Sequence, residues 1–264
     1  AEPAVPVVAM AALFDSGTAQ GEGQPEPNRP LADRLRPRTL AQVIGQSQVL
    51  GPEAPLGVML ASGSLSSLIF WGPPGVGKTT IARLLADETD LHFVQISAIF
   101  SGVADLKKVF EAAKIRRQNG QGTLLFVDEI HRFNKAQQDG FLPHMEDGTI
   151  LLVGATTENP YFEVNAPLLS RSNLFRLNEL TNTAISELLT RGASREEASI
   201  TKEAAEHLTS RADGDARRAL TALEVAVILA GGQGSQVKLV HAEQALDARA
   251  HRYGDDDHYD VVSA

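Results

Sequence analysis

Short apolar runs alternate with amphipathic segments through the middle of this 264-residue chain. The runs have the length and composition of buried strands, and the segments between them repeat apolar residues at helical spacing. We expect strands at 68–71, 92–96, 123–128, 150–155 and 174–177, and helices at 55–61, 79–88, 103–118 and 135–145. This alternation predicts an α/β fold in which helices sandwich a parallel sheet.

The pattern changes after Leu180, where the expected strands stop. Four helical segments follow at 182–191, 201–211, 215–229 and 239–248, separated by Gly192, Gly231 and Gly232. At the other end, residues 1–29 are rich in Ala, Gly, Pro, Gln and Glu and are predicted to be a disordered tail. We therefore expect an α/β domain over 30–178 and a small all-α domain over 179–250.

The segment from Gly72 to Thr80 matches the phosphate-binding P-loop, or Walker A motif, G-x-x-x-x-G-K-[ST]. It lies between an expected strand and an expected helix, so backbone N–H groups and the helix N-terminus can meet phosphate oxygens. We expect Lys78 to reach the β- and γ-phosphates and Thr79 to bind Mg²⁺. The expected nucleotide contacts are Gly72, Pro74, Gly75, Val76, Gly77, Lys78, Thr79 and Thr80. The complete match argues against a glycine-rich turn that binds nothing.

Two carboxylates, Asp128 and Glu129, end the apolar run that begins at Thr123. A buried strand rarely ends in paired acids without a functional reason. Beside a P-loop, Asp128 can hold Mg²⁺, and Glu129 can orient and deprotonate an attacking water. The alternative is a solvated strand end. His131 follows closely, but no second His lies at ligand spacing, so we expect a polar loop residue rather than a metal ligand.

Composition narrows the possible chemistry and partners. The chain has no cysteine, which excludes disulfides, thiolate catalysis and cysteine-based zinc sites. No apolar run approaches the length of a membrane span, and the N-terminus has no basic region typical of a signal peptide. A net charge of −9 argues against coating of nucleic acid by bulk positive charge, although a local contact stays possible.

Longer strings carry a family resemblance. They are DEIHRFNKAQQD from Asp128, GATTENP from Gly154, LLSR from Leu168 and GDARRAL from Gly214. Together they resemble the AAA+ ATPases of the clamp-loader clade. Within that clade the chain is most similar to the replication-associated recombination protein A family, bacterial relatives of the Werner helicase-interacting protein. The resemblance runs from about Pro30 to the chain end.

The resemblance implies further roles for matching residues. Thr157, with Asn159 nearby, resembles the sensor that positions the lytic water, and Arg171 resembles the arginine finger that reaches a neighbouring subunit's nucleotide. Arg217 resembles the sensor that ties the helical lid to the phosphates. The segment containing Arg36, Ile44 and Gly45 resembles the one that packs on adenine. The alternatives are a polar turn, surface arginines and a loop on the sheet edge.

The family also implies an activity and partners. We expect Mg²⁺-dependent ATP hydrolysis coupled to action on forked, gapped or end-containing DNA at stalled or damaged replication forks. Single-strand-binding protein is an expected partner, and the location is bacterial, cytoplasmic and nucleoid-associated. The family continues into a C-terminal domain that forms a tetramer. We expect this chain to stop before that domain, with 251–264 as the start of the linker.

Basic residues suggest where DNA touches. Lys107, Lys114 and Arg117 fall on one side of the expected helix 103–118, and a solvated helix face is an equal alternative. Alternative functions also stay open: a scaffold switched by ATP, or a clamp-loader or branch-migration motor subunit. A small-molecule kinase is disfavoured because it does not need Arg171 and Arg217.

Overall fold

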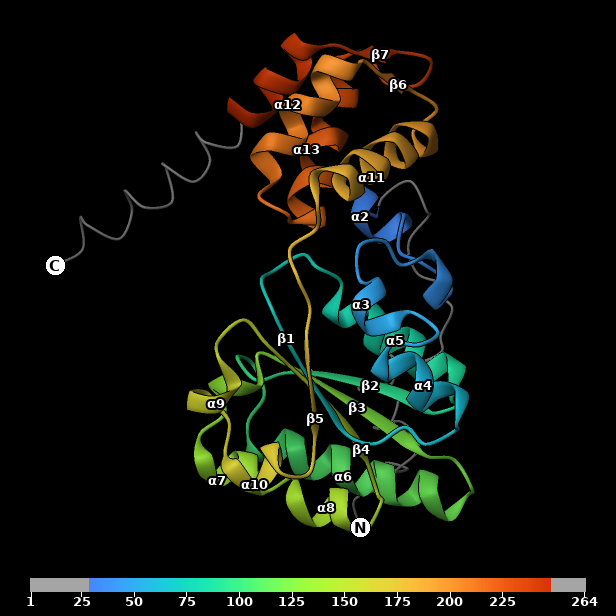
Figure 1. The fold of residues 1–264 in the computed structure, drawn as a ribbon. Helices are drawn as coiled ribbons and strands as arrows, with labels where there is room; N and C mark the ends of the chain where they lie inside the picture. The colour runs from blue at the N-terminus through green and yellow to red at the C-terminus, as the bar shows by residue number, and fades with distance from the viewer. Residues whose placement is uncertain (1–28, 248–264) are drawn as a thin grey trace, which may run out of the picture. The chain divides into compact units, whose positions relative to one another are not determined.

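The structure, a computed structural model, describes residues 29–247. The chain folds into two compact units (Figure 1). The first contains residues 37–178, and the second contains residues 29–36 together with 179–247. The tail expected up to residue 28 and the linker expected over 251–264 lie outside the described residues.

The first unit is built on a five-stranded parallel sheet in the order β2-β3-β4-β1-β5. The strands are β1 (Leu68–Trp71), β2 (His92–Ser97), β3 (Thr123–Asp128), β4 (Leu151–Thr156) and β5 (Asn173–Arg176). All five coincide with the expected apolar runs to within one residue at each end. The α/β prediction is therefore confirmed.

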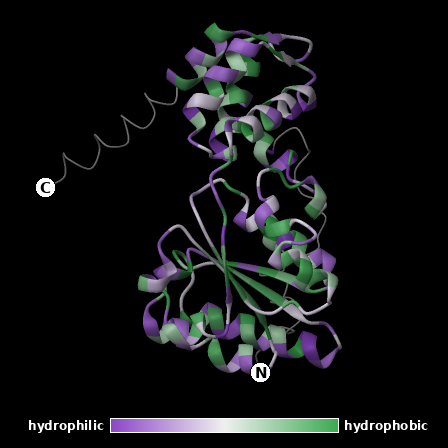
Figure 2. Ribbon diagram, in the orientation of Figure 1, coloured by the Kyte–Doolittle hydropathy of each residue, from purple (hydrophilic) through white to green (hydrophobic). Residues whose placement is uncertain are grey.

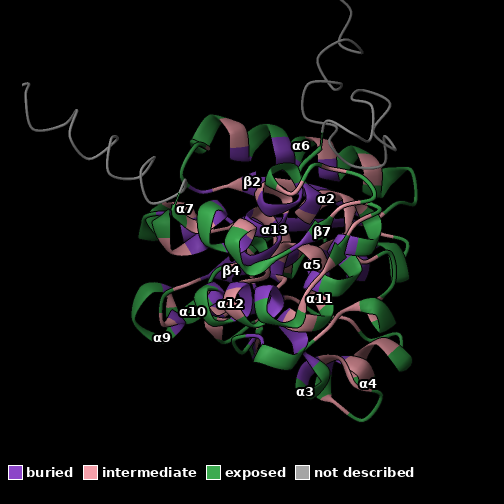
Figure 3. Ribbon diagram, turned by 90° about the horizontal axis from the view of Figure 1, so that it is seen from above, coloured by how far each residue is buried: buried purple, intermediate pink, exposed green. Residues whose placement is uncertain are grey.

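Helices cover both faces of this sheet, because successive strand residues point to opposite sides. In β3, Leu124 and Phe126 pack with α3 (Ser47–Leu50), α4 (Pro55–Ala61) and α5 (Lys78–Glu88). Leu125 and Val127 pack against α6 (Val103–Gln118) on the other face. Figure 1 shows these two helical layers. Figures 2 and 3 show that the strands are apolar and buried while the outer helix faces are polar and exposed.

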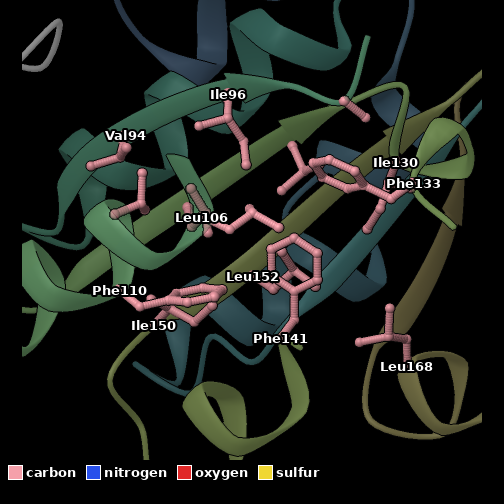
Figure 4. Close-up of a cluster of buried hydrophobic side chains, with 14 of the residues drawn as sticks. Val94, Ile96, Leu106, Phe110, Ile130, Phe133, Phe141, Ile150, Leu152 and Leu168 are labelled. Atoms are coloured by element: carbon pink, nitrogen blue, oxygen red, sulfur yellow. The ribbon is translucent and has the colours of Figure 1, made fainter. Parts of the chain in front are cut away.

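The α6 side of the sheet holds an aromatic core (Figure 4). The Phe110 and Phe141 rings meet edge to face, with centroids 5.7 Å apart, which is a favourable aromatic geometry. Ile130 and Phe133 extend from the loop after β3 into the same cluster. These two buried side chains anchor the segment that contains His131, which lies between them.

The prediction of one helix over 135–145 is wrong. The structure has α7 (Lys135–Asp139) and α8 (Leu142–Glu146), separated at Gly140 and Phe141. Pro143 explains the break, because it lacks an N–H group and is tolerated only in the first turn of a helix. Four further elements are too short to show a hydrophobic periodicity in the sequence. They are η2 (Leu40–Gln42), η3 (Ile130–Arg132), α9 (Pro160–Glu163) and α10 (Ala166–Leu169).

The second unit is mainly helical. It contains α2 (Leu31–Arg34), α11 (Asn182–Arg195), α12 (Lys202–Ala212) and α13 (Ala216–Leu229), and residues 239–247 are also helical. The expectation that strands stop after Leu180 is wrong in one detail. Two residue pairs form a short parallel ladder between β6 (Ser199–Ile200) and β7 (Gln236–Val237). Strands this short carry no periodic signal.

Gly192 does not separate two helices, contrary to the prediction, but lies inside α11. A Cβ atom there would come 2.7 Å from Leu223 Cδ2 and 3.3 Å from Leu35 Cδ1. The residue is therefore small to allow close packing. Leu35 follows α2, whose Arg34 forms ion pairs with Glu196 and Glu224. These contacts explain why residues 29–36 belong to the second unit rather than to the α/β unit.

Candidate nucleotide site

The P-loop connects β1 to α5 and uses glycine where the backbone requires it. Gly75 and Gly77 have φ values of 71° and 100°, in the left-handed region that favours glycine. Gly77 is the N-cap of α5, so the first free N–H groups of that 11-residue helix face the loop. A helix N-terminus preceded by such a loop is suited to bind phosphate.

Gly72 is required for a different reason. Its Cβ would lie 2.2 Å from the backbone oxygen of Leu177, because the start of the loop passes close to the end of β5. Gly72→Ala is expected to destabilise the protein by about 2 kcal/mol or more, since the backbone cannot move aside, and to weaken ATP binding. Thermal denaturation and nucleotide titration test this. Gly120→Ala is the control: φ is also positive there, but its Cβ would meet nothing within 4 Å.

Lys78 is the buried charge of the site. Its side chain belongs to the first turn of α5 and is only 8% exposed. Its ammonium group donates hydrogen bonds to the carbonyl oxygens of Gly72 and Pro73, each at 2.7 Å. The positive charge is thus held inside the loop, where it can bind nucleotide phosphates.

The acidic pair lies at the carboxyl end of β3. Asp128 is the last strand residue, and Glu129 follows with φ at 52°. Left-handed backbone is uncommon for a side chain such as glutamate and often marks functional sites. Thr79 on α5 and Asp128 supply a hydroxyl and a carboxylate, oxygen donors of the type that Mg²⁺ takes beside nucleotide phosphates. These residues fit the expected ATP and Mg²⁺.

Thr157 follows β4, the strand that lies between β1 and β3 in the sheet. Its hydroxyl donates to Glu129 Oε2 at 3.3 Å. The structure thus brings together the predicted sensor and the predicted water-activating carboxylate. Asn159 serves differently: its side-chain oxygen accepts a hydrogen bond from Tyr161 N at 3.1 Å and caps α9.

His131 also reaches Glu129, and Thr156 contacts His131 in turn; the sequence analysis assigned neither residue a role in the site. His131 Nδ1 lies 3.3 Å from Glu129 Oε2 and 2.9 Å from Thr156 Oγ1. The expectation of a polar loop residue was therefore incomplete. Its position two residues after the acidic pair was the only available signal, and it does not reveal a contact with β4.

The segment expected at adenine is divided between the units. Arg36 lies in the second unit and pairs with Asp33, whereas Ile44 and Gly45 lie in the first. Next to them is Gln46, a fully buried residue that sequence reasoning missed. Its amide donates to Asn178 O at 2.8 Å and to Val76 O at 3.4 Å. Gln46 thus ties this segment to the P-loop.

Arg171 lies at the amino-terminal end of the strands, whereas the P-loop lies at their carboxyl-terminal end. It precedes β5, whose first residue Asn173 pairs with Leu68 at the start of β1. The P-loop follows the other end of β1, about 13 Å away along the strand. The Arg171 side chain is 43% exposed, and its guanidinium group pairs with Glu146 Oε1 at 2.8 Å. A pocket of about 440 Å³ opens beside these two residues, distant from the P-loop.

Arg217 lies in the second unit, in the first turn of α13, with its side chain exposed. It makes no ion pair with another residue in the described range. The nearby Asp213 pairs with Arg218 at 2.7 Å. Asp215 accepts a hydrogen bond from Arg218 N and caps the helix.

The predicted DNA-binding residues are all exposed on α6. Arg117 lies 3.9 Å from Asp147, whose pKa is lowered by hydrogen bonds from Thr149 and further by Arg117. Burial lowers the pKa of His144, and the nearby Lys114 lowers it further. Lys107 and Lys114 make no salt bridge with another described residue. The helix therefore offers two free cations beside a partly neutralised one.

Residues 29–247 contain neither a metal-binding cluster nor a membrane-spanning helix. No cluster of three or more His, Asp or Glu side chains in this range is arranged to hold a metal ion. No helix in the same range is both long and apolar enough to cross a membrane.

Comparison with known proteins, like the geometry of the site, indicates an ATPase. Residues 68–180 match the family described as "ATPase family associated with various cellular activities (AAA)", and residues 194–264 match the "AAA C-terminal domain". Replication-associated recombination protein A of Escherichia coli K12 is 42% identical over 89% of this chain and 56% of its own length. The chain thus spans about half the length of the curated relatives it matches.

More distant relatives agree. ATPase WRNIP1 of Dictyostelium discoideum is 41% identical over 75% of this chain and 23% of its own length. The solved structure of the Thermotoga maritima RuvB Holliday junction branch migration motor superimposes with a TM-score of 0.67 at 27% identity, covering 81% of this chain and 72% of that one. The P-loop, the acidic pair and these likenesses agree, and the chain belongs to the AAA family of ATPases, among the relatives of replication-associated recombination protein A.

Proposed function

We propose that this protein is a Mg²⁺-dependent ATPase that acts on DNA at stalled or damaged replication forks. The observation that carries the ATPase assignment is the convergence on Glu129. Its carboxylate contacts Thr157 at the end of β4, next to the strand that leads into the P-loop. A carboxylate held beside a phosphate-binding loop is suited to orient and deprotonate water.

The proposed roles follow from this geometry. Lys78 neutralises the β- and γ-phosphates, and Thr79 and Asp128 hold Mg²⁺. Mg²⁺, when bound, neutralises the charge that develops on the leaving phosphate oxygens. Glu129 accepts a proton from the attacking water, and Thr157 orients that water against the γ-phosphate. Arg217 is proposed to act as the second sensor and Arg36 as an adenine contact, as the family resemblance implies.

Arg171 is proposed to act on the nucleotide of a neighbouring subunit. Its position at the amino-terminal end of the strands supports this, because its own P-loop follows the carboxyl-terminal end of β1. Such a finger stabilises transition-state charge. We therefore propose that the active form is a homo-oligomer, as the family's tetramer suggests, in which each site draws residues from two chains.

The DNA assignment rests on the relatives. Their names describe replication-associated recombination and Holliday junction branch migration. The exposed cations of α6 support a contact with the phosphate backbone. Forked, gapped or end-containing DNA is the proposed substrate, single-strand-binding protein is the proposed partner, and the bacterial cytoplasm at the nucleoid is the proposed location.

A coupled ATPase assay tests the proposed function. ATP hydrolysis is measured with and without Mg²⁺, and with and without a forked duplex that carries a single-stranded gap. The proposal predicts hydrolysis that requires Mg²⁺ and rises several-fold with the DNA. Hydrolysis that the DNA does not change would contradict the coupling to DNA, and absent hydrolysis would contradict the ATPase assignment.

The α6 contact makes a separate prediction. Lys107→Ala with Lys114→Ala is expected to weaken DNA binding and to reduce the slope of log affinity against log salt by about two, because two phosphate contacts are lost. Fluorescence anisotropy over a salt series measures this. Lys202→Ala with Lys238→Ala removes the same charge from exposed positions of the second unit and should leave the slope unchanged. An unaltered slope for the α6 pair would remove this helix from the binding surface.

A nucleotide-switched scaffold is the second candidate function. The observation that favours it is the ion pair between Arg171 and Glu146 within one subunit. While this pair holds, the finger is engaged in its own chain and hydrolysis is slow. In that case ATP binding alone would recruit partners, and the gapped fork would not accelerate hydrolysis.

A further inference from the structure

The Glu129 carboxylate is surrounded by polar groups from two separate segments. Thr157, after β4, donates to Oε2 at 3.3 Å. His131, in η3, brings Nδ1 to within 3.3 Å of the same oxygen. His131 Nδ1 also lies 2.9 Å from the hydroxyl of Thr156, the last residue of β4. One imidazole nitrogen thus joins the acidic residue to the end of the neighbouring strand.

The donors and acceptors around His131 place the imidazole proton on Nδ1. An ionised carboxylate only accepts, so a stabilising contact with Glu129 requires His131 Nδ1 to donate. The Thr156 hydroxyl accepts from Glu158 N at 3.0 Å and can donate its one hydrogen to Glu158 O at 3.3 Å. It therefore has a lone pair free to accept from His131. Glu129 Oε2 and the Thr156 hydroxyl both receive a hydrogen bond when they share the single Nδ1–H of His131.

The packing leaves the imidazole little freedom. Ile130, the first residue of η3, and Phe133, which follows η3, are 0% and 2% exposed and extend into the core on the α6 face (Figure 4). The His131 side chain itself is only 10% exposed. Thr156 is fully buried in the sheet. A donor fixed on both sides in this way can hold a carboxylate in one orientation.

We propose that His131 is a positioning residue for Glu129. Its Nδ1–H group holds the carboxylate oxygen in place and links it, through Thr156, to the strand end that carries Thr157. Any displacement of that strand end is thereby transmitted to the water-activating group. This inference rests on the proposed ATPase function and adds a residue that acts through Glu129 without touching the nucleotide.

The test separates turnover from binding. The turnover number is measured for the full chain at saturating ATP and Mg²⁺ with gapped fork DNA, and ATP affinity is measured by titration of a fluorescent ATP analogue. His131→Ala is expected to lower turnover about tenfold, because the base is misplaced, while affinity stays within twofold. His131→Asn, whose amide nitrogen can occupy the position of Nδ1, should recover at least half of the wild-type rate.

Further variants keep the test valid if His131→Ala does not fold. His131→Leu fills the same space without a donor and should turn over as slowly as the alanine variant. Thr156→Val combined with His131→Ala should cost no more than the larger single effect, since both remove one link. Arg132→Ala is the matched control, because Arg132 lies next to His131 in η3 with an exposed side chain.

The outcomes distinguish a failure of the His131 inference from a failure of the proposed ATPase function. If the wild type hydrolyses ATP and the turnover of His131→Ala is within twofold of the wild-type turnover, this inference alone is overturned. The same holds if His131→Asn turns over ATP as slowly as His131→Leu. A wild-type chain that binds ATP and does not hydrolyse it would overturn the proposed function, and this inference with it.

Discussion

Arg171→Ala is expected to lower ATP turnover of the assembled protein about 10³-fold or more while ATP binding is retained. The reason is geometric. Arg171 lies at the amino-terminal end of the strands and its own P-loop at their carboxyl-terminal end, so the arginine can only contribute to a neighbour's site. Turnover at saturating ATP and affinity for a fluorescent ATP analogue are the measurements. A variant that keeps more than a tenth of wild-type turnover would contradict the finger assignment.

Glu146→Gln is the matched control for this variant. It removes the charge that pairs with Arg171 in the same subunit and leaves the arginine intact. We expect turnover that is unchanged or raised, because the finger no longer has to leave a local carboxylate. The exposed ion pair itself contributes at most about 1 kcal/mol, so folding should not be affected.

The second large effect is expected for Glu129→Gln. The glutamine preserves the shape of the side chain and an oxygen that can accept from Thr157, but it cannot take a proton from water. We expect turnover to fall by about 10²–10⁴-fold, with ATP binding unchanged or tighter. Single-turnover hydrolysis and equilibrium binding measure the two quantities.

Glu163→Gln makes the same chemical change at an exposed position of α9 and should retain the wild-type rate. Full turnover by Glu129→Gln would show that another group activates the water. In that case the contacts of Glu129 with Thr157 and His131 would be structural only.

The sheet and the P-loop could be predicted because their signals are local. A short apolar run, such as Leu68–Trp71, is enough to mark a buried strand, and Lys78 and Gly77 belong to a contiguous motif. The acidic pair was predictable for the same reason, since Asp128 and Glu129 contradict the apolar strand that they end. In each case the sequence neighbours carry the information.

The features that were missed depend on residues distant in the chain. Gly192 interrupts a helical pattern by composition, but Leu223 and Leu35 determine that it packs inside α11. Gln46 is an ordinary polar residue until the fold places Val76 and Asn178 beside it. His131 likewise gains its role only from Thr156, 25 positions later. No periodicity or motif encodes such pairings.

A subunit-mixing experiment tests the central claim most directly, namely that this chain hydrolyses ATP at sites completed by Arg171 of a neighbour. Arg171→Ala and Glu129→Gln chains are mixed under conditions, including gapped fork DNA, in which the wild type is active. The account predicts that the mixture hydrolyses ATP several-fold faster than the average of the two variants alone, because one supplies a working site and the other a finger. A mixture no faster than that average would contradict it.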